Sequence, residues 1–427
     1  FILQKNLTMV CYSGGPYIKV PQFGAQFGYD FLKYQTPANL VLKNKEVALA
    51  AQLEALNRDP WMAELTLDWI RRLKNFGVST VMFYQFVEAW TDSRFGVPLL
   101  RALNGTSTPV YDAVKEYIVS NRVSTFPLTV APPADDFVCT PSCVWGDCIS
   151  NICVCYVGYS GPACDVSSPD PQQQQKIGMN LAGIADYSTE IPFVDAMKTS
   201  RDWTVNLVGG GWGSGQARYA EIPQDSDGYP TSLPDGLTVL ALISRDLISH
   251  YDNGTYILLY DGDGSMTFGM DDVPNVTRGV GRIELNVVPT TNMNNGIMIT
   301  IVRTNPSNYI RNMRLIRPGF ENIYNRVVFH PMFLSKIQPY GTLRFMEWGA
   351  TNVQTNEEWV DRTQVSFRTF SINGVPFEYM IKLCNIMGKN MWVNVPHLAS
   401  DDFIQKLATL IKTTLRPDLK VYVEYSN

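Results

Sequence analysis

The sequence predicts a multidomain α/β protein that contains a small disulfide-rich module and an inserted β-sandwich. Three observations lead to this fold class. Strand and helix patterns alternate near both ends of the chain, which is typical of a parallel sheet or barrel. Six of the eight cysteines lie between Cys139 and Cys164. Segments with period-two hydrophobicity, separated by turn residues, occupy about residues 236–304 and indicate the sandwich.

The composition is that of a globular protein with well-packed cores. The chain has 427 residues, of which 45% are hydrophobic, 12% aromatic and 18% charged, with a net charge of −5. This length suits two or three domains. We expect no nucleic-acid partner, because the sequence has no basic stripe. We expect no membrane span, because no apolar run approaches about 18 residues.

The head of the chain, before the cysteines, reads as alternating strands and helices. One helix is bounded clearly, since Pro60 stands at its start and Gly77 follows its end. A turn, Ser13-Gly14-Gly15, closes the first strand. The expected elements are strands at 6–12 and 78–86 and helices at 45–57, 60–75 and 110–121.

The tail begins a new globular region at Gly178 and regains α/β character after the sandwich. A polar linker, Ser167 to Lys176, precedes it. The expected sandwich strands are 237–243, 255–260, 282–288 and 296–302. The expected α/β elements are strands at 179–184, 342–346, 390–395 and 419–424 and helices at 376–387 and 401–415.

The cysteine segment is too short to bury a core, so covalent staples must hold it. Two zinc sites are the alternative, but zinc fingers pair close ligand arms across a longer spacer. The spacing from Cys139 to Cys164, with its ending Cys-x-Cys-x2-Gly-Tyr-x-Gly-x2-Cys, resembles an EGF-like module. This resemblance implies the bridges Cys139–Cys148, Cys143–Cys153 and Cys155–Cys164.

Disulfides indicate an oxidising compartment, and we therefore expect a secreted, extracellular protein. Four Asn-x-Ser/Thr sequons support this localisation and predict N-linked glycans at Asn6, Asn104, Asn253 and Asn275. The two cysteines outside the module, Cys11 and Cys384, lie in apolar contexts and are expected to be buried free thiols.

No cofactor or metal is expected. The glycine-rich stretch 209–215 lacks the Gly-Lys-Ser/Thr of a phosphate-binding loop. Asp261-Gly-Asp-Gly264 resembles the start of a calcium loop, but Met266 stands where an EF-hand needs glycine. A hairpin turn is the better interpretation of that segment.

Motifs in the head and tail resemble a family of secreted, clan-A-type glycoside-hydrolase-like barrels found mainly in bacterial cellulose-associated proteins. The tail carries the motifs of the opening half of that barrel, at 178–190, 344–348 with Asn352, 391–402 and 421–427. The head carries those of the closing half, at 10–15, 57–62 and 78–86. The fold class is thus incomplete or permuted (β/α)8-type barrel portions with an inserted β-sandwich and an EGF-like module.

The resemblance divides the chain into five parts. They are 1–122, the closing half with strands seven and eight; 123–138, a Pro-rich linker; 139–165, the EGF-like module; 166–177, a Pro/Gln linker; and 178–427, the opening half with strands one to four and the sandwich at about 236–304.

The two halves stand in reversed order, and strands five and six are missing. A circular permutation explains the reversed order of the halves, but it does not explain why strands five and six are missing. A window from a tandem array of barrels and EGF-like modules explains both, and we favour it. It also accounts for the lack of an initiator Met and signal peptide and for a sequence that ends directly after a strand. Separate chains that complete one another's barrels in a filament are compatible with either explanation.

The resemblance implies a retaining mechanism that needs two carboxylates about 5–5.5 Å apart. The acid/base Glu would follow Asn427. The nucleophile belongs to a Tyr-Glu-Gly-Gly motif, where this chain has Tyr12-Ser13-Gly14-Gly15. A serine without an activating base is a poor nucleophile at an anomeric carbon. No catalytic residue is therefore expected, and Ser13 and Asn427 mark a degenerate site.

Other polar and aromatic residues lie where barrel strands end. Glu88, Glu347 and His397 are alternative acid or base candidates, although ordinary rim positions explain them better. Trp348, Trp392 and Trp90 are possible sugar-stacking residues, and a core position is the equal alternative.

Two functions are compatible with these patterns. The first is an extracellular structural protein, a repeating unit of a glycosylated fibril or appendage, because EGF-like modules recur in mastigoneme-like tubular fibrils. Its partners would be copies of itself in a helical or tandem filament. The second is a secreted polysaccharide-binding protein or weak glycoside hydrolase, whose partner would be a polysaccharide.

Overall fold

The computed structural model describes most of the tail and parts of the head. The described residues are 9–14, 63, 66–67, 70, 78–83, 109–120, 139, 142–149, 152–167, 177–292 and 294–425. The helix predicted at 45–57 and the Pro-rich linker therefore lie outside the described residues. So do five predicted site residues, Asn6, Glu88, Trp90, Asn104 and Asn427.

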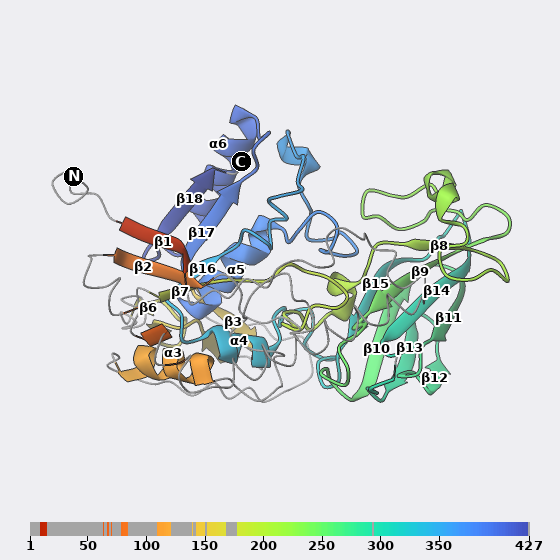
Figure 1. Ribbon diagram of the computed structural model, residues 1–427, viewed down its shortest axis with the longest axis horizontal. Helices are drawn as coiled ribbons and strands as arrows, with labels where there is room; N and C mark the ends of the chain where they lie inside the picture. Colours follow the sequence, from red (N-terminus) through yellow and green to blue (C-terminus); the bar gives the residue numbers. More distant parts are fainter. Residues whose placement is uncertain are drawn as a thin grey trace, which may run out of the picture.

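A six-stranded parallel sheet unites the head with the tail (Figure 1, left). The decisive pair is β2 with β7, in which Val81, Met82 and Phe83 lie opposite residues 177–179. The strands in spatial order are β1 (Met9–Gly14), β2 (Val78–Phe83), β7 (Ile177–Asn180), β16 (Thr342–Arg344), β17 (Asn390–Val395) and β18 (Val421–Tyr425).

This order follows the numbering seven, eight, one, two, three, four that the resemblance assigns to these segments. The sheet is open, since β1 and β18 are its two edges, and the described residues form no closed barrel. The first strand also runs two residues past its predicted end. Ser13 accordingly lies inside β1 instead of in a turn.

The helices of the α/β part begin and end where their sequences provide caps. In α6 (Asp401–Thr414), the Ser400 hydroxyl accepts a hydrogen bond from Phe403 N at 3.2 Å. α5 (Phe377–Met387) ends at Gly388, whose φ of 62° lies in the left-handed region that glycine tolerates. In the head, α3 (Pro109–Ser120) buries Tyr111, which donates to Lys336 O of α4 (Pro331–Ile337) at 3.3 Å.

The insertion is a pair of four-stranded antiparallel sheets (Figure 1, right). It is longer than predicted, because β8 and β15 add an outer strand to each sheet. One sheet contains β12 (Asn275–Arg278), β13 (Arg282–Val287), β10 (Gly254–Asp261) and β15 (Arg311–Ile316). The other contains β11 (Gly264–Gly269), β14 (Ile297–Thr304), β9 (Leu237–Ile243) and β8 (Thr204–Leu207).

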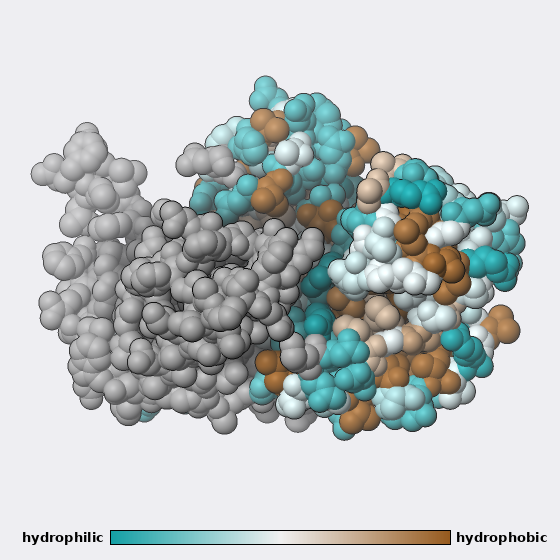
Figure 2. Space-filling view, turned by 45° about the vertical axis from the view of Figure 1, so that its right-hand side comes forward, coloured by the Kyte–Doolittle hydropathy of each residue, from teal (hydrophilic) through white to brown (hydrophobic). Residues whose placement is uncertain are grey.

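The turn at Asp261–Gly264 is not a hairpin, which corrects the sequence interpretation. β10 and β11 follow each other directly but belong to different sheets. The turn therefore carries the chain across the sandwich, with Asp261 accepting from Asn312 Nδ2 at 2.6 Å and Asp263 from Asn308 Nδ2 at 2.9 Å. Over the described part of the face in Figure 2, polar and apolar residues are interspersed.

Three disulfides hold the cysteine-rich module at 139–165, namely Cys139–Cys148, Cys143–Cys153 and Cys155–Cys164. These are the pairs that the resemblance implies. The sulfurs of Cys139, Cys143 and Cys153 lie within 4.8 Å of one another, but all three are in disulfides and offer no thiolate to a metal. Small hairpins, β3 (Gly146–Ile149) with β4 (Ile152–Cys155) and β5 (Tyr159–Ser160) with β6 (Val166–Ser167), complete the module.

The module packs against the α/β part through Arg416, whose side chain is 0% exposed. Its guanidinium donates to Val157 O of the module and, at 2.9 Å, to Asn385 O of α5. It also lies 4.6 Å from the Tyr159 ring centroid and pairs with Asp418 at 2.8 Å. One buried cation thus joins the module, α5 and the segment before β18.

Replacing Arg416 with Met should loosen this joint. The variant keeps the apolar stem but leaves the Val157 and Asn385 carbonyl oxygens without their donor, so we expect a loss of about 3 kcal/mol in the free energy of unfolding. Urea unfolding measures the loss. Amide exchange at Val157, whose N–H donates to Ile386 O at 3.2 Å, should also accelerate. Lys406→Met, at a 53% exposed side chain on α6, is the control and should change neither measurement.

Candidate functional site

Polar side chains gather at the carboxyl edge of the parallel sheet. The carboxyl ends of parallel strands meet at one edge, where binding sites of α/β proteins commonly form. Register places Arg344 of β16 between Asn180 of β7 and Trp392 of β17. Asn394 of β17 lies opposite Glu424 of β18. This edge is therefore the candidate functional site.

A buried ion pair crosses the site. Arg344 is 1% exposed and donates from Nε and Nη2 to the two Glu424 carboxylate oxygens at 2.9 and 2.7 Å. Trp392 Nε1 donates to Glu424 Oε2 at 2.8 Å. Partial burial raises the pKa of Glu424, but the hydrogen bonds and charge of Arg344 outweigh it and lower that pKa below its ordinary value. Glu424 is thus held as a carboxylate.

Asn394 lies beside the hydrogen bonds that Arg344 and Trp392 donate to Glu424. It is 6% exposed, and neither its amide oxygen nor its amide nitrogen has a hydrogen-bond partner in the described part of the chain. Its amide approaches Glu424 closely enough to favour the charged carboxylate. A buried amide in this state could donate to and accept from a hydroxyl of a ligand.

Glu190 is a second carboxyl near the sheet, in the opposite electrostatic state. It is 1% exposed, and its Oε1 accepts from Ala182 N, just after β7, at 2.9 Å. Desolvation raises its pKa to about 8, against the weaker effects of this hydrogen bond and of the Trp348 indole. Its Oε2 has no hydrogen-bond partner among the described residues. Glu190 is therefore mostly protonated at neutral pH.

The acid and base candidates predicted from sequence are spread over this edge. Ser13 lies near the carboxyl end of β1, at the expected position. Glu347 is partly buried after β16 and faces the loop containing Gly183. His397 is exposed, and its carbonyl oxygen accepts from the Tyr425 hydroxyl at 3.0 Å. Within the described part of the chain, no contact joins Glu347 to His397.

Trp348 is not available to a sugar, which corrects its prediction as a stacking residue. It is 0% exposed and packs within 6.5 Å (ring centroids) of four phenylalanines, Phe193, Phe329, Phe333 and Phe345. Trp392 is 6% exposed, with its indole N–H committed to Glu424 and its ring stacked 5.5 Å from Tyr422. Trp392 thus positions Glu424 and does not offer a free aromatic surface on which a sugar could stack.

Sequence reasoning assigned no role to Arg344, Glu424 or Glu190. All three lie in motifs that carry the barrel resemblance, so their positions were visible. The pairing of Arg344 with Glu424 across two strands was not, because it depends on the order of strands in the sheet.

Outside this edge, Asn253 and Asn275 are exposed on the sandwich, so both sequons are accessible. Cys384 is buried without a disulfide, and the side chain of Cys11 lies outside the described residues. No helix among the described residues is long and apolar enough to cross a membrane.

Comparisons with protein-family models, curated proteins and solved structures find no match to this chain.

Glu190 should make the protein less stable as the pH rises. Its folded pKa of about 8 exceeds the ordinary 4.5, so the folded state binds more protons than the unfolded state between these values. The contribution of Glu190 to the free energy of unfolding is greatest below pH 4.5. It decreases as the pH rises to about 8, by up to a few kcal/mol. Urea unfolding at pH 5 and pH 8 measures the fall. Glu190→Gln should reduce it, and an unchanged pH slope would contradict the assignment.

Neutralising Glu424 should destabilise the fold, because Glu424→Gln removes the carboxylate charge that accepts from Nε and Nη2 of the buried Arg344 guanidinium. Breaking a buried pair in this way costs about 3–5 kcal/mol. Urea unfolding at pH 7 measures the loss. Glu221→Gln is the matched control, since Glu221 pairs with Arg218 at 2.7 Å on the surface, and it should have little effect. Equal losses in the two variants would show that burial of Arg344 is not decisive.

Proposed function

We propose that this chain is an extracellular structural protein, a repeating unit of a glycosylated fibril or appendage. The single observation that carries the proposal is the open parallel sheet with an exposed apolar edge. Parallel sheets are usually covered on both faces. On β18, however, Val423 is 67% exposed and Tyr425 62%. Such an edge is a template for pairing with another chain.

The occupant that we propose for this edge is a second copy of the chain. At the opposite edge, β1 pairs only with β2 among the described residues, so the described sheet offers two different edges. A contact between unlike edges is heterologous and, unless it closes into a ring, propagates as a filament. The two edges of the sheet thus supply the geometry of a repeating assembly.

The disulfides and sequons support the extracellular setting. Three disulfides in one small module are typical of secreted proteins. Asn253, just before β10, and Asn275, the first residue of β12, are exposed on the sandwich, whose strands lie on the right of Figure 1, apart from β1 and β18. Glycans there would therefore leave the sheet edges free.

The state of the carboxyl edge favours this proposal over hydrolysis. Glu424 is committed to Arg344 and Trp392, and Glu190 is enclosed. Hydrolysis of a glycoside needs two carboxyl groups that both reach the scissile bond. The second candidate is a polysaccharide-binding protein, which the unpartnered amide of Asn394 favours, because binding a hydroxyl needs no catalytic pair.

Val423→Lys tests the proposed contact. A charge at the centre of the exposed strand opposes edge pairing, so we expect association to weaken at least about tenfold. Analytical ultracentrifugation of the full chain over a concentration series measures association, and electron microscopy shows whether filaments form.

Val280→Lys is the matched control, because Val280 is 104% exposed in the turn between β12 and β13 of the sandwich. It introduces the same charge away from the sheet edges and should leave association unchanged. A wild-type chain that stays monomeric at high concentration would contradict the proposal, as would equal effects of the two lysines.

A further inference from the structure

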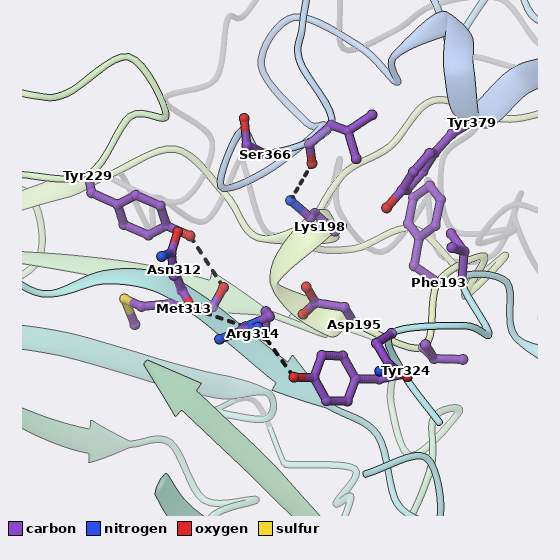
Figure 3. Close-up of a pocket in the computed structure, with 14 residues that line it drawn as sticks. Phe193, Asp195, Lys198, Tyr229, Asn312, Met313, Arg314, Tyr324, Ser366 and Tyr379 are labelled. Carbon is purple, nitrogen blue, oxygen red and sulfur yellow. Dashed lines mark hydrogen bonds between the residues drawn. The ribbon is translucent and has the colours of Figure 1, made fainter. Parts of the chain in front are cut away.

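A half-open cavity of about 320 Å³ lies where the sandwich meets the α/β part (Figure 3). Its lining comes from η4 (Ala196–Thr199) with the preceding Asp195, from β15, from the loop at 365–366 and from α5. It is separate from the carboxyl edge of the sheet, because it contains none of the strand-end residues described there. Its volume is at the lower end of the range for small-molecule sites, about 300–1,000 Å³.

Hydrogen bonds from the backbone hold the Asp195 carboxylate in place through one of its two oxygens. Its Oδ1 accepts from Met197 N at 3.0 Å and from Leu315 N at 2.9 Å, and so caps η4 and attaches it to β15. Its Oδ2 makes no hydrogen bond within the described part of the chain. The carboxylate is therefore positioned by the backbone while one acceptor atom remains for a ligand.

Arg314 and Tyr379 provide the complementary groups. Arg314 donates from Nε to Asn312 O at 3.2 Å and from Nη1 to the Tyr324 hydroxyl at 3.3 Å, which leaves Nη2 unpartnered among the described residues. Tyr379 reaches from α5 with its hydroxyl directed toward the cavity and without a partner in the described chain (Figure 3). Three polar atoms from three elements thus face one space.

The charges around the cavity are close but not paired. Burial raises the pKa of Asp195, and the charges of Lys198 and Arg314 oppose that rise. Yet neither cation forms a direct ion pair with Asp195 in the described structure. Lys198 Nζ instead donates to Phe367 O at 2.6 Å and Val365 O at 3.1 Å, so it forms part of the wall. Because a carboxylate acceptor and a guanidinium donor face the same space, an uncharged ligand that both donates and accepts hydrogen bonds matches the cavity.

Aromatic rings supply the remaining surface. Phe193, Tyr229 and Tyr324 line the cavity beside the polar atoms. A sugar ring matches this combination, since its hydroxyls can donate to Asp195 and accept from Arg314 and Tyr379 while its C–H face packs on an aromatic side chain. We propose that this cavity binds a neutral hexopyranose residue of a glycan. The proposal is independent of the fibril function and of the strand-end site.

Titration of the full chain tests this site. The probes are D-glucose, D-galactose, D-mannose and N-acetyl-D-glucosamine at millimolar concentrations, followed by saturation-transfer NMR. At least one should bind saturably. Tyr379→Phe removes one hydroxyl and keeps the ring, so it should weaken that binding about three- to tenfold, the effect of one hydrogen bond. Asp195→Asn should weaken it as well.

Two controls separate this site from others. Tyr219→Phe removes a hydroxyl that bonds Asp202 outside the cavity and should leave binding unchanged. Asn394→Ala removes the amide at the carboxyl edge of the sheet without breaking the Arg344–Glu424 pair, so it tells whether a sugar binds at that edge instead. Binding that is lost only in Asn394→Ala, or that survives both cavity variants, would overturn the proposal. So would the absence of binding by all four sugars, or displacement of a bound sugar by inorganic phosphate or acetate.

Discussion

The parallel pairing of β2 with β7 is the constraint on which the remaining arrangement depends. Parallel neighbours cannot be joined by a tight turn, so the connection from Phe83 to Ile177 must cross over the sheet. That connection contains α3 and the cysteine-rich module. The same pairing brings β1 and β2 beside the four strands of the tail, which aligns all six carboxyl ends at one edge. The candidate site lies at this edge, on the four tail strands β7, β16, β17 and β18.

This constraint changes the role that the cysteine-rich module can have. As a joint between successive barrels, the module would hold two bodies apart. In the structure it belongs to a crossover between neighbouring strands of one sheet, and Arg416 ties it to α5. Its disulfides therefore stiffen a connection within the unit. If copies of the chain assemble, they would meet at the sheet edges, where β18 exposes Val423 and Tyr425.

Local patterns were sufficient to predict much of the fold but little of the site. The strands at 237–243 and 390–395 agree with β9 and β17 at both ends, because apolar runs bounded by turn residues determine them. Burial of Trp348 could not be decided from its own segment, since Phe193 comes from a distant segment and Phe329 and Phe333 come from in and beside α4. Asp195 likewise has an unremarkable local sequence, and its role follows from a hydrogen bond to Leu315 N, 120 positions away.

Glu190 and Glu424 show how the same side chain acquires opposite properties in one fold. Desolvation raises the pKa of Glu190, whereas Arg344 lowers that of Glu424. A protonated and an ionised carboxyl near one sheet resemble an acid and a nucleophile. Accessibility argues otherwise, because Glu190 is 1% exposed and each Glu424 oxygen already accepts from Arg344. Hydrolysis of a glycoside needs two carboxyl groups that both reach the scissile bond, and Glu190 is enclosed, so the pairing of Glu424 with Arg344 acts here as a stabilising contact of the carboxyl edge.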